Sequence, residues 1–159
     1  MIAADPLLRL EMRELQDRYI ATIDDDRLEE WPSLFVDDCF YEIIPRENEE
    51  LGLPAPLVQC TGAAMLRDRV VSLRHANIYE KPAYRHMVSG FAIERLDADT
   101  VAMACSYVVV NTTQEGTSAV YQAGRYEDRV VRTPEGWRFK SKRAIYDTSR
   151  VQTLLAYPI

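Results

Sequence analysis

The segment from Ile23 to Ile44 constrains the fold more than any other, because it predicts a helix that leads within a few residues into a strand. Three acids, Asp24-Asp25-Asp26, directly follow the last apolar position of an amphipathic helix. After them come a short helical turn with Trp31, Leu34 and Phe35, the pair Asp37-Asp38, and a strand at Cys39–Ile44. We interpret this transition as the entry into a cone-shaped α+β domain.

Two longer helices are predicted around this entry. The first begins at Asp5-Pro6, where Asp5 can cap free backbone N–H groups and Pro6 is tolerated at the first helical position. Its apolar residues recur at spacings of three and four and so share one face: Leu8, Met12, Leu15, Tyr19 and Ile23. The other helix is expected from about Thr61 to Arg74, with Met65, Leu66, Val70 and Leu73 as its apolar stripe.

The second half of the chain has the composition of strands. Four are predicted, at Tyr84–Arg95, Thr100–Thr112, Ala119–Arg132 and Trp137–Asp147. Consecutive long strands joined by short turns, such as Thr133–Gly136, pair antiparallel. Together with the strand that begins at Cys39, they predict an α+β fold in which helices pack on a strongly curved, mainly antiparallel sheet.

One stretch does not fit this scheme. Residues 45–56 are dense in proline and charge, so we predict an insertion loop or lid at about 45–60. The chain of 159 residues suits a single domain over 1–159, and it contains no repeat or linker.

Composition excludes several classes of protein. No apolar run approaches the roughly 20 residues that span a bilayer, and the first residues lack a secretion signal, so we expect a cytoplasmic protein without membrane contact. A net charge of −6 disfavours nucleic acid as a partner, and the basic run Arg138–Arg143 reads as alternate, outward-facing positions of a strand. The three cysteines, Cys39, Cys60 and Cys105, read as buried, reduced thiols.

Local strings along nearly the whole chain resemble the small (beta) subunit of bacterial aromatic-ring-hydroxylating oxygenases, the Rieske non-haem iron enzymes. Strings similar to salicylate 5-hydroxylase-type small subunits are Pro45-Arg46-Glu47-Asn48, Gly52-Leu53-Pro54 and Arg67-Asp68-Arg69-Val70. Strings similar to the terephthalate dioxygenase small subunit are Asn77-Ile78-Tyr79-Glu80 and Tyr84-Arg85-His86. Further matching strings are Asp38-Cys39-Phe40-Tyr41, Ile145-Tyr146-Asp147 and Tyr157-Pro158-Ile159.

This resemblance implies a nuclear transport factor 2-like (cystatin-like) cone. It also implies a partner, a large (alpha) subunit that carries a Rieske [2Fe-2S] cluster and a mononuclear Fe(II), often as three large and three small subunits. NAD(P)H would supply electrons through a separate reductase. The expected function is a non-catalytic, structural small subunit of a hydroxylase for an aromatic carboxylate, such as salicylate or terephthalate, with either mono- or dihydroxylation possible.

The histidine count agrees with a small subunit that carries no iron of its own. A Rieske centre and a facial-triad iron together take four histidines, whereas this chain has only His75 and His86. The chain has no phosphate loop, dinucleotide fingerprint or nucleophile elbow either. We therefore expect no catalytic centre, cofactor or metal in this chain.

Candidate subunit-interface or structural residues are Arg85, His86, Tyr146, Asp147, Tyr157, Pro158 and Ile159. Alternation along the strand puts Arg85 on the face opposite to His86, where it suits an interface. For His86 we favour a structural role beside a carbonyl or carboxylate. The apolar end of the chain, from Leu154 onward, either closes the mouth of the cone or docks on a neighbour.

Two alternatives remain open. A free-standing cone-fold isomerase or dehydratase could use a pocket formed by Asp24, Tyr41, Tyr84 and His86, with His86 and an acid as the reacting pair. Against it, acids at a helix end such as Asp24-Asp25-Asp26 are most often solvent-facing. The other alternative is a ligand-binding or scaffold module without an oxygenase partner.

Overall fold

The computed structural model describes residues 5–76, 81–147 and 155–159. The helices are α1 (Pro6–Asp24), the 3-10 helix η1 (Trp31–Leu34), α2 (Arg46–Glu50) and α3 (Ala63–His75). The strands are β1 (Phe35–Pro45), β2 (Val58–Thr61), β3 (Ala83–Arg95), β4 (Thr100–Thr112), β5 (Ser118–Thr133) and β6 (Gly136–Tyr146).

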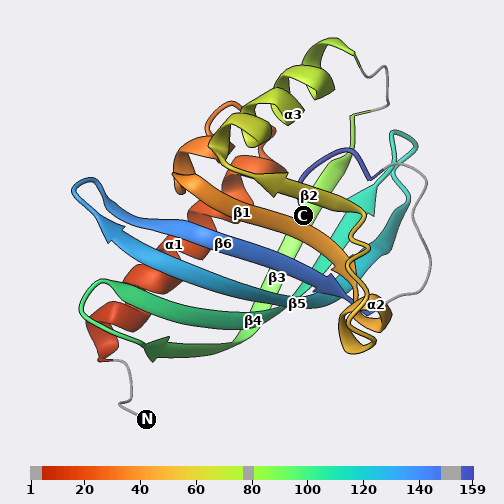
Figure 1. Cartoon of the computed structure of the whole chain (residues 1–159). Helices are drawn as coiled ribbons and strands as arrows, with labels where there is room; N and C mark the ends of the chain where they lie inside the picture. The colour runs from red at the N-terminus through yellow and green to blue at the C-terminus, as the bar shows by residue number, and fades with distance from the viewer. Residues whose placement is uncertain (1–4, 77–80, 148–154) are drawn as a thin grey trace.

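All six strands belong to one sheet, in the order β2-β1-β6-β5-β4-β3. The sheet curves strongly around α1, which lies behind it in Figure 1. Strands β3 to β6 form the predicted antiparallel meander. The prediction of an α+β cone, with helices on a curved, mainly antiparallel sheet, is confirmed.

Helix α1 forms as its sequence pattern predicts. The carboxylate of Asp5 accepts a hydrogen bond from the Leu8 backbone N–H at 2.9 Å, and all five predicted apolar residues are buried. The stripe of α3 is only partly as expected. Leu66 and Val70 are buried, but Met65 is 45% exposed, so its assignment to the core was wrong.

The largest departure concerns the region predicted as an insertion loop at 45–60. It contains α2 and most of β2, which pairs antiparallel with β1, while β1 pairs parallel with β6. Strand β2 has only four residues and follows a proline-rich stretch, so its local signal is weak. Its pairing with β1 comes from tertiary contact.

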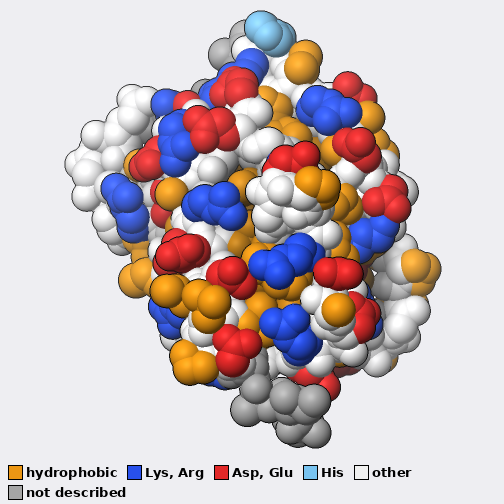
Figure 2. Space-filling model, turned by 90° about the vertical axis from the view of Figure 1, so that its left-hand side faces the viewer, with side chains coloured by type: hydrophobic (Ala, Val, Ile, Leu, Met, Phe, Trp, Pro, Cys, Tyr) orange, Lys and Arg blue, Asp and Glu red, His pale blue; other side chains and the backbone are white. Residues whose placement is uncertain are grey.

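The core lies between the concave face of the sheet and the helices, and it is rich in aromatic side chains. Fully buried members are Tyr19, Trp31, Tyr41, Tyr107, Tyr126, Phe139 and Tyr146. Figure 2 shows one side of the surface, where basic and acidic side chains alternate around hydrophobic ones without an extended area of one sign. None of the helices in the described ranges is long and apolar enough to cross a membrane.

Candidate functional site

Asp24 and His86 meet where the end of α1 reaches the outer strand β3. One carboxylate oxygen of Asp24 lies 2.6 Å from His86 Nδ1, and the other accepts a hydrogen bond from the His86 backbone N–H at 2.9 Å. The side chains are 5% and 0% exposed, so the prediction that Asp24 faces solvent was wrong. Because β3 is an edge strand, this contact also covers a backbone donor that would otherwise be free to pair.

The contact with Asp24 determines which ring nitrogen of a neutral His86 carries the proton. An ionised Asp24 accepts from Nδ1–H, so a neutral His86 leaves Nε2 unprotonated. Nε2 is buried and has no hydrogen-bond partner among the described residues. A hollow of about 490 Å³ lies beside Asp24, but it is lined by residues such as Arg85, Met87 and Val110, and His86 is not part of its lining.

The two tyrosines of the predicted pocket make different contacts. The Tyr84 ring lies 6.2 Å from that of His86, centroid to centroid. Tyr41 instead bonds to the backbone of Ile159, whose N–H donates to the Tyr41 hydroxyl at 2.9 Å. Burial raises the pKa of Tyr41 to about 12 and that of Tyr84 further, so both phenols stay protonated. The structure thus brings Asp24, His86 and Tyr84 together, whereas the Tyr41 hydroxyl is engaged by Ile159.

The described end of the chain, residues 155–159, packs inside its own cone. Ile159 is fully buried, and its carbonyl accepts a hydrogen bond from the Tyr19 hydroxyl at 2.5 Å. Pro158 is also buried, and Arg69 donates to the carbonyls of Leu155 and Ala156. Of the two predictions for this tail, closure of the cone fits these contacts. Leu154 lies outside the described residues.

Asp26 ties the tail to the helices. Its carboxylate accepts hydrogen bonds from Arg74 and from the Tyr157 hydroxyl at 3.0 Å each, and it lies 2.6 Å from Lys81 Nζ. Burial acts to raise its pKa, but the bonds from Lys81, Tyr157 and Arg74 outweigh burial and hold the pKa below its usual value. Like Asp24, Asp26 is a structural contact rather than a solvent-facing helix breaker.

The remaining interface candidates differ in accessibility. Tyr146 is buried in the core, and Asp147 forms an ion pair with Arg46 at 3.1 Å. Arg85 is exposed on the outer face of β3 and has no ion-pair or hydrogen-bond partner within the described part of the chain. Arg85 therefore is the member of this set with a free charged group at the surface.

Metal-ligating side chains do not gather in the structure. Within residues 5–76, 81–147 and 155–159, no group of three or more His, Cys, Asp or Glu could hold a metal ion. His75 is exposed at the end of α3, whereas His86 is buried and its Nδ1 is engaged by Asp24. The donors at the described positions therefore do not form the set that a facial-triad iron needs.

A buried ion pair that the sequence analysis missed lies in the middle of the core. Lys142 Nζ donates to Asp128 and to the Gln16 side-chain oxygen, both at 2.9 Å, and both members of the pair are 0% exposed. The ammonium also lies 3.9 Å from the centroid of the Tyr126 ring. Burial raises the pKa of Asp128 to about 6, against the influence of Lys142, and burial lowers the pKa of Lys142.

Alternation along the run Arg138–Arg143 predicted that Lys142 faces outward, and this prediction was wrong. The Cα partner of Val130 is Phe139 and that of Arg129 is Ser141, so Lys140 is an extra residue in β6. Such a bulge reverses the alternation of side chains, and Lys142 turns inward. The sequence signal available was weak, because simple alternation from Phe139 places Arg143 inside instead.

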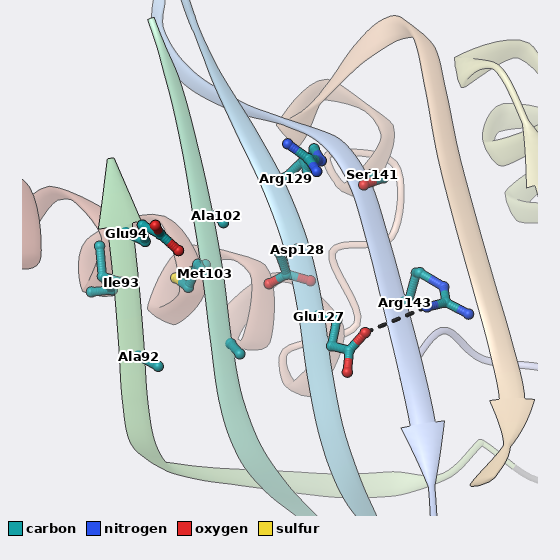
Figure 3. A pocket seen from close by; sticks show the side chains of 11 residues that line it. Ala92, Ile93, Glu94, Ala102, Met103, Glu127, Asp128, Arg129, Ser141 and Arg143 are labelled. Carbon is teal, nitrogen blue, oxygen red and sulfur yellow. Dashed lines mark hydrogen bonds and ion pairs between the residues drawn. The ribbon is translucent and has the colours of Figure 1, made fainter. Parts of the chain in front are cut away.

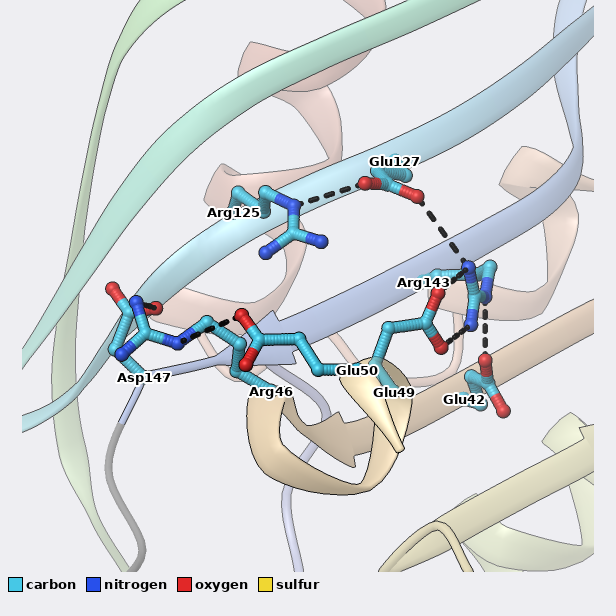
Figure 4. Close-up of polar contacts among 8 residues, drawn as sticks. All are labelled: Glu42, Arg46, Glu49, Glu50, Arg125, Glu127, Arg143 and Asp147. Carbon is cyan, nitrogen blue, oxygen red and sulfur yellow. Dashed lines mark hydrogen bonds and ion pairs between the residues drawn. The ribbon is translucent and has the colours of Figure 1, made fainter. Parts of the chain in front are cut away.

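Arg143, the next residue, organises an ionic network on the outer face of the sheet. Its guanidinium contacts Glu42 and Glu49, each at 2.5 Å, and Glu127 at 3.4 Å (Figure 4). These contacts attach α2 to β1, β5 and β6. The hydrogen bond from Arg143 holds the pKa of Glu49 below its usual value.

Beside this network, the outer face is hollowed over small side chains. A hollow of about 490 Å³ has Ala92, Ala102 and Ala104 in its lining, with Glu94, Glu127, Arg129 and Arg143 among its charged residues (Figure 3). The lining residues of the hollow come from four strands of the sheet, β3, β4, β5 and β6.

Comparisons with known proteins agree on one family. Residues 6–143 match the profile of the SnoaL-like domain. The chain is 61% identical to the small subunit of anthranilate 1,2-dioxygenase from Burkholderia cepacia, over 94% of this chain and 92% of that protein. It is 33% identical to a beta subunit of the terminal oxygenase component of terephthalate 1,2-dioxygenase from Comamonas, over 89% and 92% of the two chains.

A solved structure extends the agreement to three dimensions. A crystal structure from Novosphingobium aromaticivorans, provisionally assigned as the beta subunit of an aromatic-ring-hydroxylating dioxygenase, superposes with a TM-score of 0.88 at 43% identity. The match covers 96% of this chain and 97% of that one. The predicted nuclear transport factor 2-like cone and the resemblance to oxygenase small subunits are both confirmed.

Proposed function

Because the chain belongs to the small subunits of aromatic-ring-hydroxylating dioxygenases, we propose that it is the structural subunit of a terminal oxygenase that hydroxylates an aromatic carboxylate. The observation that carries this proposal is 61% identity across 94% of the chain to the small subunit of an anthranilate dioxygenase. Anthranilate is accordingly the first substrate to test, followed by terephthalate. Salicylate, suggested by local strings, stays a prediction.

In this role the chain acts by assembly. We expect a large subunit to hold the Rieske cluster and the mononuclear Fe(II), with electrons from NAD(P)H through a reductase. The small subunit buries part of the large subunit and helps to fix a cytoplasmic assembly of three large and three small subunits. Its own residues supply rigidity: the Asp24–His86 contact fastens α1 to the sheet edge, and residues 155–159 fill the cone.

Purification from the native host tests the proposal. A tagged copy of this chain, isolated under mild conditions, is expected to bring down a larger iron–sulfur protein as a reddish-brown complex whose mass fits equal numbers of both subunits. The complex is expected to hydroxylate anthranilate when a reductase and NAD(P)H are supplied. A colourless oligomer of this chain alone would contradict the proposal.

The free-standing isomerase or dehydratase remains as a second candidate, because His86 Nε2 is buried without a described partner and Asp24 orients the ring. Replacement of His86 separates the two. His86→Ala, and His86→Asn, whose side-chain amide can still donate to Asp24, should leave turnover per iron in the purified assembly largely intact. Loss of turnover with unchanged assembly and iron content would favour a chemical role for His86.

A further inference from the structure

Residues 46–56, which comprise α2 and most of the loop that leads to β2, contain no buried residue. We call this segment the α2 flap. Its two leucines point into solvent, because Leu51 is 65% exposed and Leu53 is 48% exposed. Segments that bury few apolar side chains open locally at low cost while the rest of the protein stays folded. Polar contacts, rather than burial, therefore hold the α2 flap on the sheet.

The α2 flap is tied to itself by hydrogen bonds between its helix and its loop. The backbone N–H of Leu53 donates to the carbonyl of Asn48 at 2.8 Å. The side-chain amide of Asn48 in turn donates to the carbonyl of Ala55 at 2.8 Å. None of these bonds involves the sheet, so they survive if the flap leaves it. The flap can thus move as one body between its junctions with β1 and β2.

Among the described residues, two ion pairs join the α2 flap to the sheet side of the molecule (Figure 4). Glu49 is bidentate on Arg143, with Oε1 3.1 Å from Nη1 and Oε2 2.5 Å from Nη2. Arg46 Nη1 lies 3.1 Å from a carboxylate oxygen of Asp147, directly after β6. The side chains are 27% and 29% exposed in the first pair, and 48% and 49% exposed in the second. Salt therefore screens both pairs.

Release of the flap leaves no buried charge without a partner. Arg143 keeps a second carboxylate, because its Nε donates to Glu42 at 2.5 Å. Glu49 itself moves into water, where an ionised carboxylate is well solvated. Opening thus costs partly exposed ion pairs, each of which contributes little in water. A change in ionic strength is accordingly large enough to shift the balance between a closed and an open flap.

We propose that the α2 flap is an ionic latch. It closes over Arg143 at low ionic strength and moves away as one body at high ionic strength, while the sheet stays folded. In the open state Glu49 no longer occupies the terminal nitrogens of Arg143, so the position of the flap decides whether this guanidinium is accessible. All parts of the latch lie within this chain, and the inference does not rest on the proposed function.

A distance between two spin labels on the full chain tests the latch. Leu53→Cys carries one label on the loop of the flap, and Leu10→Cys carries the other on α1, where Leu10 is 54% exposed. The native cysteines are buried, so labelling selects the introduced ones. Pulsed electron paramagnetic resonance measures the distribution of distances at salt concentrations from about 0.05 M to about 1 M.

We expect one distance at low salt and a second population that grows about threefold to tenfold relative to the first by about 1 M salt. In the labelled chain, Glu49→Gln should raise the open population about threefold to fivefold already at low salt. Glu47→Gln is the matched control, because it makes the same change at an exposed position of α2 outside the contacts of Figure 4. It should follow the labelled parent at every salt concentration.

Circular dichroism of each sample checks that the sheet is intact, and the salt series on the labelled parent keeps the test valid if Glu49→Gln does not fold. A single distance at every salt concentration would overturn the latch. An equal shift in Glu47→Gln would also overturn it, because net charge rather than the contact with Arg143 would then be responsible. A second distance that appears only as the sheet melts would refute motion of the flap as one body.

Discussion

Two neighbouring residues of β6 place acid–base pairs on opposite sides of the same sheet. Lys142 points inward to Asp128, and Arg143 points outward to Glu127, Glu42 and Glu49. The side chain of Lys142 is 0% exposed and that of Arg143 is 27% exposed. One strand therefore carries a fully buried ion pair on one face of the sheet and a partly exposed ionic network on the other.

The difference shows how burial decides the sign of an electrostatic contribution. For Asp128, loss of water outweighs the attraction of Lys142, and its pKa rises to about 6 from an ordinary value of 3.8. For Glu49, the hydrogen bond from Arg143 outweighs burial, and its pKa falls below the ordinary 4.5. Ionisation of Asp128 therefore costs stability at neutral pH even with Lys142 present, and removal of one partner costs more because it leaves the other buried without a counter-charge. The outer network stabilises the folded state.

Breaking the inner pair should have the largest effect. Asp128→Ala leaves Lys142 buried without its carboxylate, and we expect a loss of about 3–5 kcal/mol in the free energy of unfolding. Urea denaturation of the isolated chain measures it. The matched control replaces both partners, Asp128→Leu with Lys142→Met, and should recover most of the loss because no charge remains buried. A cost below about 1 kcal/mol for Asp128→Ala would contradict the pair's isolation from water.

The pH dependence of stability should differ in sign between the two regions. Asp128 has a raised pKa in the folded state, so its contribution is complete below pH 3.8 and is lost as the pH rises through about 6. Wild type should therefore lose up to roughly 3 kcal/mol relative to Asp128→Asn between these values. Denaturation of both proteins at several pH values tests this, and parallel curves would refute it.

Removing the centre of the outer network should have an intermediate effect. Arg143→Met leaves Glu42, whose side chain is 7% exposed, without its partner, and the expected loss is about 1–2 kcal/mol. Urea denaturation again provides the measurement. Arg125→Met is the matched control, because its ion pair with Glu127 has side chains 39% and 40% exposed and should contribute less.

The smallest effect is expected for Glu49→Gln, which removes one partly exposed carboxylate from the network. We expect a loss of about 0.5 kcal/mol at low salt that disappears near 1 M salt, because exposed pairs are screened. Glu49 has a lowered pKa, so its contribution is present above pH 4.5 and is lost below it, opposite to Asp128. A loss that persists in high salt would mean that the contact is not electrostatic.

Much of the fold followed from local patterns. The helix at Pro6–Asp24 was predicted from its cap and apolar spacing, and the meander from alternation and turns, because these signals act between residues close in the chain. The short strand β2 and the parallel contact of β1 with β6 were not predicted. Both depend on partners that are distant in sequence.

The site residues divide in the same way. The sequence alone identified His86, the tail and the family, since residue types and strings can be read in one dimension. Only the tertiary structure decided that Asp24 holds His86 across 62 positions and that Ile159 binds Tyr41 across 118. It also turned Lys142 inward, because one extra residue in β6 reverses which side chains face the core. Local sequence sets each element's pattern, whereas register and long-range contact set which face of the element is buried.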